Sequence, residues 1–157
     1  MEKVLLMDSK KCTGCLQCEI ACSFQTEGIF NPVKSRIKVF EFSETSLFVP
    51  YTCTQCAEAW CMAVCPVDAI SVNGATGAKI VNDHICVGCK VCTIACPFGT
   101  INYNPDSGKV LKCDLCGGDP ACVTICPTTA LSFVEADTSG AGKMREWAAK
   151  TDANVKT

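Results

Sequence analysis

The sequence of 157 residues lacks several features that mark common classes of protein. It contains no apolar run of about 20 residues, the length that a membrane-spanning helix needs, so we expect no membrane span. Its formal net charge is −2, without the basic excess that nucleic-acid-binding domains carry, so we expect no nucleic-acid partner. It has neither a G-x-G-x-x-G motif nor a phosphate-binding loop, so nothing indicates a nicotinamide, flavin or pterin site.

Apolar side chains are scarcer than the composition suggests. The hydrophobic fraction of 48% includes sixteen cysteines, and without them the chain falls below the average for globular domains. A chain of this length forms one compact domain or two very small ones. Bound metal can stabilise such a chain, because a site that exists only in the folded state adds its binding free energy to that of folding.

The cysteines form four groups of four, and none is left over. Each group begins with C-x2-C and ends with x3-C. Groups one and three have the spacing C-x2-C-x2-C-x3-C, and groups two and four have a longer middle gap. In chain order the groups are Cys12, Cys15, Cys18 and Cys22; Cys53, Cys56, Cys61 and Cys65; Cys86, Cys89, Cys92 and Cys96; and Cys113, Cys116, Cys122 and Cys126.

Group three, which is followed by Pro97, reproduces the bacterial ferredoxin run for a [4Fe–4S] cluster. Three closely spaced cysteines allow a tight loop to present three thiolates to one cluster, and the fourth cysteine leaves on the next segment to ligate the other cluster of a pair. Groups two and four also end in Cys-Pro, whereas Ser23 follows the last cysteine of group one. Every ligand position is cysteine, so the spacing predicts four [4Fe–4S] clusters.

Other uses of the cysteines fit less well. Zinc sites usually take two C-x2-C pairs roughly 12–20 residues apart, often with histidine, but His84 is the sole histidine. Disulfides need an oxidising compartment. The segment from Met1 to Cys12 resembles no signal sequence, so we expect a cytoplasmic location. A thiol redox relay needs only one C-x2-C pair.

Short β-prone runs between the cysteine groups predict three β-hairpins. In each case two such runs flank a turn that is polar or contains glycine. The paired runs are 36–42 with 47–51, 69–72 with 79–81, and 100–103 with 109–111.

Helical segments are expected to be short. One or two helical turns are predicted around the later cysteines of each group, as in 89–96. Near the end of the chain, Met144, Trp147 and Ala148 have the spacing of a narrow apolar helix face within 142–150. We favour a terminal helix that packs on its own body over a helix that docks a partner.

Four further residues stand out beside the motifs. His84 is interpreted as a surface residue at a hairpin end rather than a proton-coupled group. Lys90 and Lys112 are interpreted as solvated lysines rather than as groups that raise a cluster's potential or bind an acidic partner. Trp60, next to a cysteine of group two, is expected to shield a cluster from water.

The four motifs and the hairpins between them resemble the iron–sulfur subunits of molybdenum and tungsten oxidoreductases, the dimethyl sulfoxide reductase iron–sulfur subunit family. The resemblance covers roughly residues 3–133, and the short chain is closest in type to the small electron-transfer subunit of tungsten aldehyde oxidoreductase. It implies an α+β fold of tandem bacterial-ferredoxin-like halves with β-hairpin insertions. The halves would be 1–25 with 110–157, and 51–109, connected by a hairpin over 26–50.

The resemblance also implies how the cysteines are shared. Motif one would pair with motif four, and motif two with motif three, each lending its last cysteine to the other's cluster. The implied ligand sets are Cys12, Cys15, Cys18 and Cys126; Cys113, Cys116, Cys122 and Cys22; Cys53, Cys56, Cys61 and Cys96; and Cys86, Cys89, Cys92 and Cys65.

The implied function is that of a non-catalytic electron-transfer subunit in anaerobic metabolism. It would relay single electrons between a large catalytic subunit, with tungsten or molybdenum pterin, and a second redox protein or flavin subunit. Alternatives are a free polyferredoxin, a carrier for carbon monoxide dehydrogenase or hydrogenase, and a scaffold whose clusters are structural. End-to-end stacking of chains is a further hypothesis.

Overall fold

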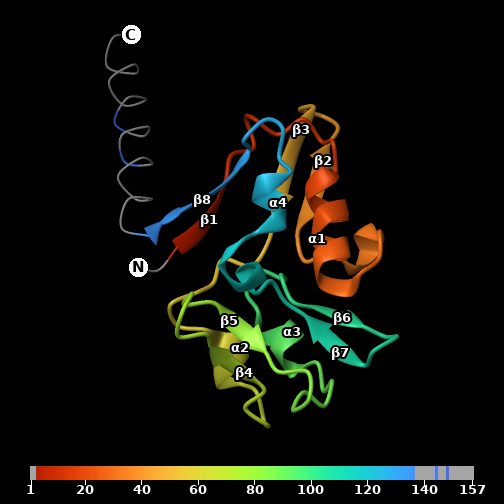
Figure 1. Ribbon diagram of the computed structural model, residues 1–157, viewed down its shortest axis with the longest axis vertical. Helices are drawn as coiled ribbons and strands as arrows, with labels where there is room; N and C mark the ends of the chain where they lie inside the picture. Colours follow the sequence, from red (N-terminus) through yellow and green to blue (C-terminus); the bar gives the residue numbers. More distant parts are fainter. Residues whose placement is uncertain (1–2, 137–143, 145–147, 149–157) are drawn as a thin grey trace.

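The computed structural model describes residues 3–136, 144 and 148, and these form two lobes (Figure 1). The upper lobe in this view contains the antiparallel strand pairs β1–β8 and β2–β3 with helices α1 and α4, and the lower lobe contains the pairs β4–β5 and β6–β7 with helices α2 and α3. The upper elements are β1 (Lys3–Met7), α1 (Gln17–Glu27), the 3₁₀ helix η1 (Pro32–Lys34), β2 (Lys38–Phe42), β3 (Leu47–Tyr51), α4 (Ala121–Thr124) and β8 (Leu131–Glu135). The lower elements are α2 (Trp60–Ala63), β4 (Ile70–Val72), β5 (Lys79–Val81), α3 (Val91–Ala95), β6 (Asn102–Asn104) and β7 (Lys109–Leu111).

All three predicted hairpins are confirmed. They are the pairs β2–β3, β4–β5 and β6–β7, each with adjacent strands in antiparallel register. Together with the short helices they confirm the predicted α+β class. The lower strands are only three residues long, whereas those of β2–β3 have five.

A fourth strand pair was not predicted. Strand β1 pairs with β8 in antiparallel register, so that Lys3 lies opposite Glu135 and Met7 opposite Leu131. The strands lead directly into motif one and out of motif four. Their pairing therefore holds the first and last cysteine motifs in the same lobe.

Each α-helix begins one residue before the third cysteine of its motif. Helices α2, α3 and α4 have four or five residues, because Cys-Pro follows each of them and the residue before a proline is disfavoured in helical conformation. Helix α1 instead continues for 11 residues and ends at Gly28, whose φ is +70°. Ser23 permits this extension, since a proline there would block the helix.

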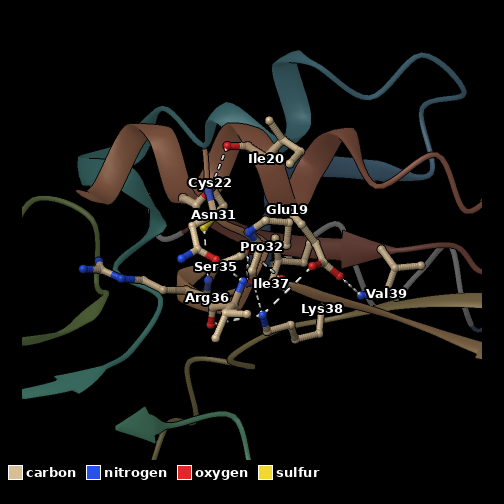
Figure 2. A network of polar contacts seen from close by, with 12 residues as sticks. Glu19, Ile20, Cys22, Asn31, Pro32, Ser35, Arg36, Ile37, Lys38 and Val39 are labelled. Carbon is tan, nitrogen blue, oxygen red and sulfur yellow. Dashed lines mark hydrogen bonds and ion pairs between the residues drawn. The ribbon is translucent and has the colours of Figure 1, made fainter. Parts of the chain in front are cut away.

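Figure 2 shows how the segment after α1 is fixed against that helix. The side chain of Glu19 accepts a hydrogen bond of 2.7 Å from the Val39 amide. The Ser23 hydroxyl, fully buried, accepts one of 3.1 Å from the Asn31 amide. Strand β2 is therefore anchored to the helix that carries the last two cysteines of motif one.

Cysteines form part of both buried cores. The upper core joins Ile37 and Leu131 to three cysteines, and the lower core joins Ile70, Ile101 and Val110 to three others. The cysteines concerned are Cys18, Cys22 and Cys122 above, and Cys61, Cys86 and Cys92 below. The stability of each lobe thus depends on whatever the cysteines bind.

Two other predictions are not tested by the described residues. The division at residues 25, 50 and 110 stays a prediction. The terminal helix over 142–150 lies outside the described residues apart from Met144 and Ala148. Within the described residues, no helix has the length and apolar character needed to cross a membrane.

Candidate iron–sulfur sites

Each motif opens with the same backbone turn. The residue immediately before the second cysteine has a positive φ in all four motifs: +70° at Gly14, +51° at Gln55, +67° at Gly88 and +59° at Leu115. Residues other than glycine rarely adopt this conformation, which costs of order 1–3 kcal/mol and is concentrated at functional sites. All four motifs, including the two stretched ones, therefore share a left-handed residue at this position.

Three cavities are each lined by four cysteines. Each takes three cysteines from one motif and the fourth from another motif, in the crosswise arrangement that the family resemblance implies. The sets are Cys12, Cys15, Cys18 and Cys126; Cys113, Cys116, Cys122 and Cys22; and Cys53, Cys56, Cys61 and Cys96.

The remaining four cysteines lie in the lower lobe. Cys86 and Cys92 are buried in its core, and Cys65 packs against the same core. Burial raises the pKa of the Cys92 thiol, and the nearby cysteines Cys89, Cys61 and Cys86 raise it further. The fourth implied ligand set, with Cys65 beside motif three, stays a prediction.

The buried thiols are poor acids in the metal-free chain. Burial, followed by the nearby charge of Glu19, raises the pKa of Cys18 to about 12. Burial raises the pKa of Cys113 to about 11, and burial together with neighbouring thiols raises the pKa of Cys122 further. Iron ligation needs thiolates, so the cations of a cluster must replace these protons.

The last cysteine of each motif accepts hydrogen bonds from the segment that follows it. Cys22 Sγ accepts from the Arg36 amide at 3.3 Å, and Cys65 Sγ accepts from the Ala69 amide at 3.2 Å. Burial raises the pKa of Cys96, but hydrogen bonds lower it below its ordinary value. They come from the hydroxyl and amide of Thr100 and from the amides of Phe98 and Gly99. For Cys126, burial again raises the pKa, but hydrogen bonds led by the amide of Leu131 lower it below its ordinary value.

The cavity of motif four also fits a sulfide-bearing group. Arg36 lines it, and Arg36 Nε is a buried nitrogen without a hydrogen-bond partner among the described residues. A donor of this kind is costly to bury unless it meets an acceptor. Four cysteines are the ligands that a [4Fe–4S] cluster needs, and an N–H donor beside them can hydrogen-bond to its sulfurs.

Comparisons with known proteins agree with this chemistry. Residues 44–136 match the model of the 4Fe-4S dicluster domain, and residues 9–25 match that of a 4Fe-4S binding domain. The chain is 45% identical to the aliphatic sulfonate oxidoreductase polyferredoxin-like subunit of Pyrococcus furiosus, over 78% of this chain and 70% of that protein. It is 38% identical to the thiosulfate reductase electron transfer subunit PhsB of Salmonella typhi, over 87% and 77%.

The chain belongs to the 4Fe-4S dicluster family. The B subunit of anaerobic dimethyl sulfoxide reductase from Haemophilus influenzae is a further relative, 35% identical over 83% of this chain and 72% of that protein. One component of the active site complex BamBC of benzoyl coenzyme A reductase has a similar fold, with a TM-score of 0.51, 25% identity, and coverage of 99% of this chain and 97% of that component.

These comparisons confirm several predictions about this chain. The family, the ferredoxin-like α+β fold and the [4Fe–4S] cofactors are confirmed. At the level of the family, so is the function as an electron-transfer iron–sulfur subunit that is not catalytic alone. The relatives serve as subunits of oxidoreductases; which catalytic partner this chain has is a separate question.

The prediction that Lys112 is solvated is wrong. Its side chain is buried, with 4% of its surface exposed. It lines the motif-two cavity together with Lys79, which is 6% exposed. Nothing in the local sequence indicates this, because Lys11 has the same place directly before the first cysteine of motif one and its side chain is 56% exposed. Only the packing of β5 and β7 against motif two distinguishes the two lysines.

The other three marked residues lie near the surface. Lys90 is exposed, with its ammonium 3.9 Å from the centre of the Tyr103 ring, a cation–π contact. His84 is exposed, as expected. Trp60 lines the motif-two cavity but is 63% exposed, so its cover over that cavity is partial.

Gln55 is a residue that motif reasoning passed over. Its side-chain amide donates a hydrogen bond of 2.7 Å to the Cys113 carbonyl and accepts one of 2.9 Å from the Lys79 amide. Gln55 therefore joins motif two to motif four, and so the lower lobe to the upper. Its place before the second cysteine, where motifs one and three have glycine, was the only signal available in the sequence.

Proposed function

We propose that this chain holds four [4Fe–4S] clusters in the crosswise ligand sets and relays single electrons along them. The observation that supports this most directly is the set of three cavities, each lined by three cysteines of one motif and the last cysteine of another. A cluster, when bound, supplies one-electron transfer. The chain supplies burial, hydrogen bonds to sulfur and fixed spacing.

The fold supports a linear order of sites. Cavities of motifs one and four share the upper lobe, where α1 contacts α4, and the sites of motifs two and three share the lower lobe, where α2 contacts α3. Gln55 and the Cys113 carbonyl connect motif two to motif four across the lobes. The order is therefore motif one, four, two and three.

The two ends of this order are also the accessible ones. Cys15 in motif one and Cys89 in motif three are exposed, and the other cysteines are buried or intermediate. Electrons would enter at one of these ends and leave at the other. The same exposure supports end-to-end stacking of chains, which light scattering over a range of concentrations would reveal.

The proposed partner at one end is a large catalytic subunit with tungsten or molybdenum pterin. The relatives from thiosulfate and dimethyl sulfoxide reductases support an oxidoreductase complex. A second redox protein or flavin subunit would contact the other end. We include a cytoplasmic location in the proposal, because a reducing compartment keeps cysteine thiols available to ligate iron.

An anaerobic pull-down with metal analysis tests the partner. Tungsten or molybdenum in a large subunit that stays bound through salt washes supports the proposal. Nickel in that subunit would instead indicate carbon monoxide dehydrogenase or hydrogenase, and a chain that elutes alone with its iron would indicate a free polyferredoxin.

Matched cysteine variants test the ligand sets. The crosswise sets predict that Cys126→Ala alters the same electron paramagnetic resonance (EPR) signal as Cys12→Ala, whereas Cys22→Ala alters the same signal as Cys113→Ala. If Cys22→Ala and Cys12→Ala alter one signal and Cys126→Ala another, each motif holds its own cluster and the crosswise sets are wrong. Fewer than four clusters in the wild-type chain by iron analysis would contradict the count.

A further inference from the structure

Lys112 is held as an ammonium ion inside the protein. Its Nζ donates hydrogen bonds to three oxygens: the Lys79 carbonyl, the Cys113 carbonyl at 3.1 Å and the Gln55 side-chain oxygen at 3.2 Å. An ammonium has three N–H donors, so three acceptors satisfy it completely.

All three partners of Lys112 are neutral. Among the residues that the structure describes, no carboxylate lies within ion-pair distance of Lys112 Nζ. Burial of a charge is costly unless an opposite charge lies nearby. The wall that Lys112 shares with Cys53, Cys56, Cys61 and Cys96 is the place where such a charge would be held.

The cavity of motif four shows the contrasting arrangement. Its cation, Arg36, lies 3.8 Å from a Glu27 oxygen and 3.4 Å from an Asp114 oxygen, so carboxylates balance it. Lys79, on the motif-two cavity, adds a second buried ammonium that donates to the Gly77 carbonyl at 3.2 Å. The two central cavities therefore differ: carboxylates lie beside the cation of the motif-four cavity, whereas none within the described residues lies within ion-pair distance of Lys112 Nζ.

We propose that Lys112 is the fixed countercharge of the cluster held by Cys53, Cys56, Cys61 and Cys96 and raises its reduction potential. This rests on the proposed function, because it requires that cluster. With both clusters bound, one electron would leave the motif-four cluster and enter the motif-two cluster, with no bond made or broken, and Lys112 would lie beside the cluster that gains the electron.

An EPR-monitored redox titration of the full holoprotein tests this role. In Lys112→Met the midpoint potential of one EPR component should fall by at least about 59 mV. For one electron this is a tenfold lower ratio of reduced to oxidised cluster at a given applied potential. The other components should stay in place, and Lys112→Arg should restore most of the lost potential. Lys11→Met is the matched control, because it removes an exposed lysine from the same motif position, and no component should move tenfold.

The outcomes separate the two proposals. A wild-type chain without four clusters overturns the proposed function and this inference with it. Four clusters in Lys112→Met with unchanged potentials overturn the inference alone. If Lys112→Met loses iron, Lys112→Gln gives the second measurement: it keeps N–H donors at this position but removes the charge, so a lowered component supports the role and an unchanged one contradicts it.

Discussion

The two lobes carry the same cysteine motif on scaffolds of different strength. In the upper lobe, strands of five residues pair as β1–β8 and β2–β3, and α1 extends over 11 residues. In the lower lobe every strand has three residues and no helix exceeds five. An isolated hairpin of two such short strands is only marginally stable in water. The lower lobe therefore depends more on its cysteine ligands for its structure.

The lobes also differ in the charge beside their clusters. Buried Glu19 adjoins Cys18 in the upper lobe, whereas buried Lys79 and Lys112 line the motif-two cavity in the lower lobe. Negative charge lowers the reduction potential of a nearby cluster and positive charge raises it. The comparison therefore places a carboxylate beside the motif-one cysteines and two lysines beside the motif-two cysteines.

Removal of iron should have the largest effect and should divide the lobes. After anaerobic chelation, we expect the amides of β4–β5 and β6–β7 to lose their protection from hydrogen exchange, because their short ladders have no other support. The amides of β1–β8 should retain part of theirs. Measurement is by hydrogen exchange with mass spectrometry, with iron and sulfide reconstitution as the control. Equal loss in both lobes would refute the difference in scaffold strength.

Ser23→Pro gives motif one the sequence that the other motifs have. We expect it to destabilise the protein by about 3 kcal/mol or more, because proline inside α1 removes a helix hydrogen bond and clashes with the preceding turn. The Asn31 amide also loses its hydroxyl acceptor. Anaerobic urea unfolding measures the change. The reverse exchange, Pro127→Ser, should cost about 1 kcal/mol or less; similar costs for both would show that the long α1 does not need serine.

Gly14 and Gly88 are equivalent positions with different neighbours. Both have a positive φ, so alanine costs about 1–2 kcal/mol at either. A Cβ at Gly88 would lie 2.1 Å from the Gly108 carbonyl oxygen, whereas at Gly14 it would meet the Phe48 ring at 2.5 Å. A side chain moves more easily than backbone, so Gly88→Ala should cost about 1–3 kcal/mol more than Gly14→Ala in urea unfolding. An equal cost would show that the β6–β7 turn yields as readily as a side chain.

Much of this organisation could be predicted from the sequence, and the failures have a common cause. Turn chemistry and β-prone runs are local, so the hairpins were found. The pairing of Leu5 with Phe133 joins the two ends of the described chain, and no local pattern reports it. The burial of Lys112 has the same origin, since Lys11 precedes its cysteine identically yet lies at the surface. Local sequence defined the motifs, and tertiary packing decided their electrostatic surroundings.

Glu19→Gln should have the smallest effect, with the opposite sign to Lys112→Met. Glutamine keeps an oxygen for the Val39 amide but removes the charge beside Cys18, so the motif-one cluster should become easier to reduce. Lys38, 4.0 Å from the other Glu19 oxygen, already offsets part of that charge, so the shift should stay below the tenfold, or about 59 mV, expected for Lys112. The same EPR titration measures it, with exposed Glu44→Gln as the control. A fall in potential, or a rise equal to that of the control, would mean that Glu19 does not set the reduction potential of the motif-one cluster. The charge difference between the lobes would then rest on the lysines alone.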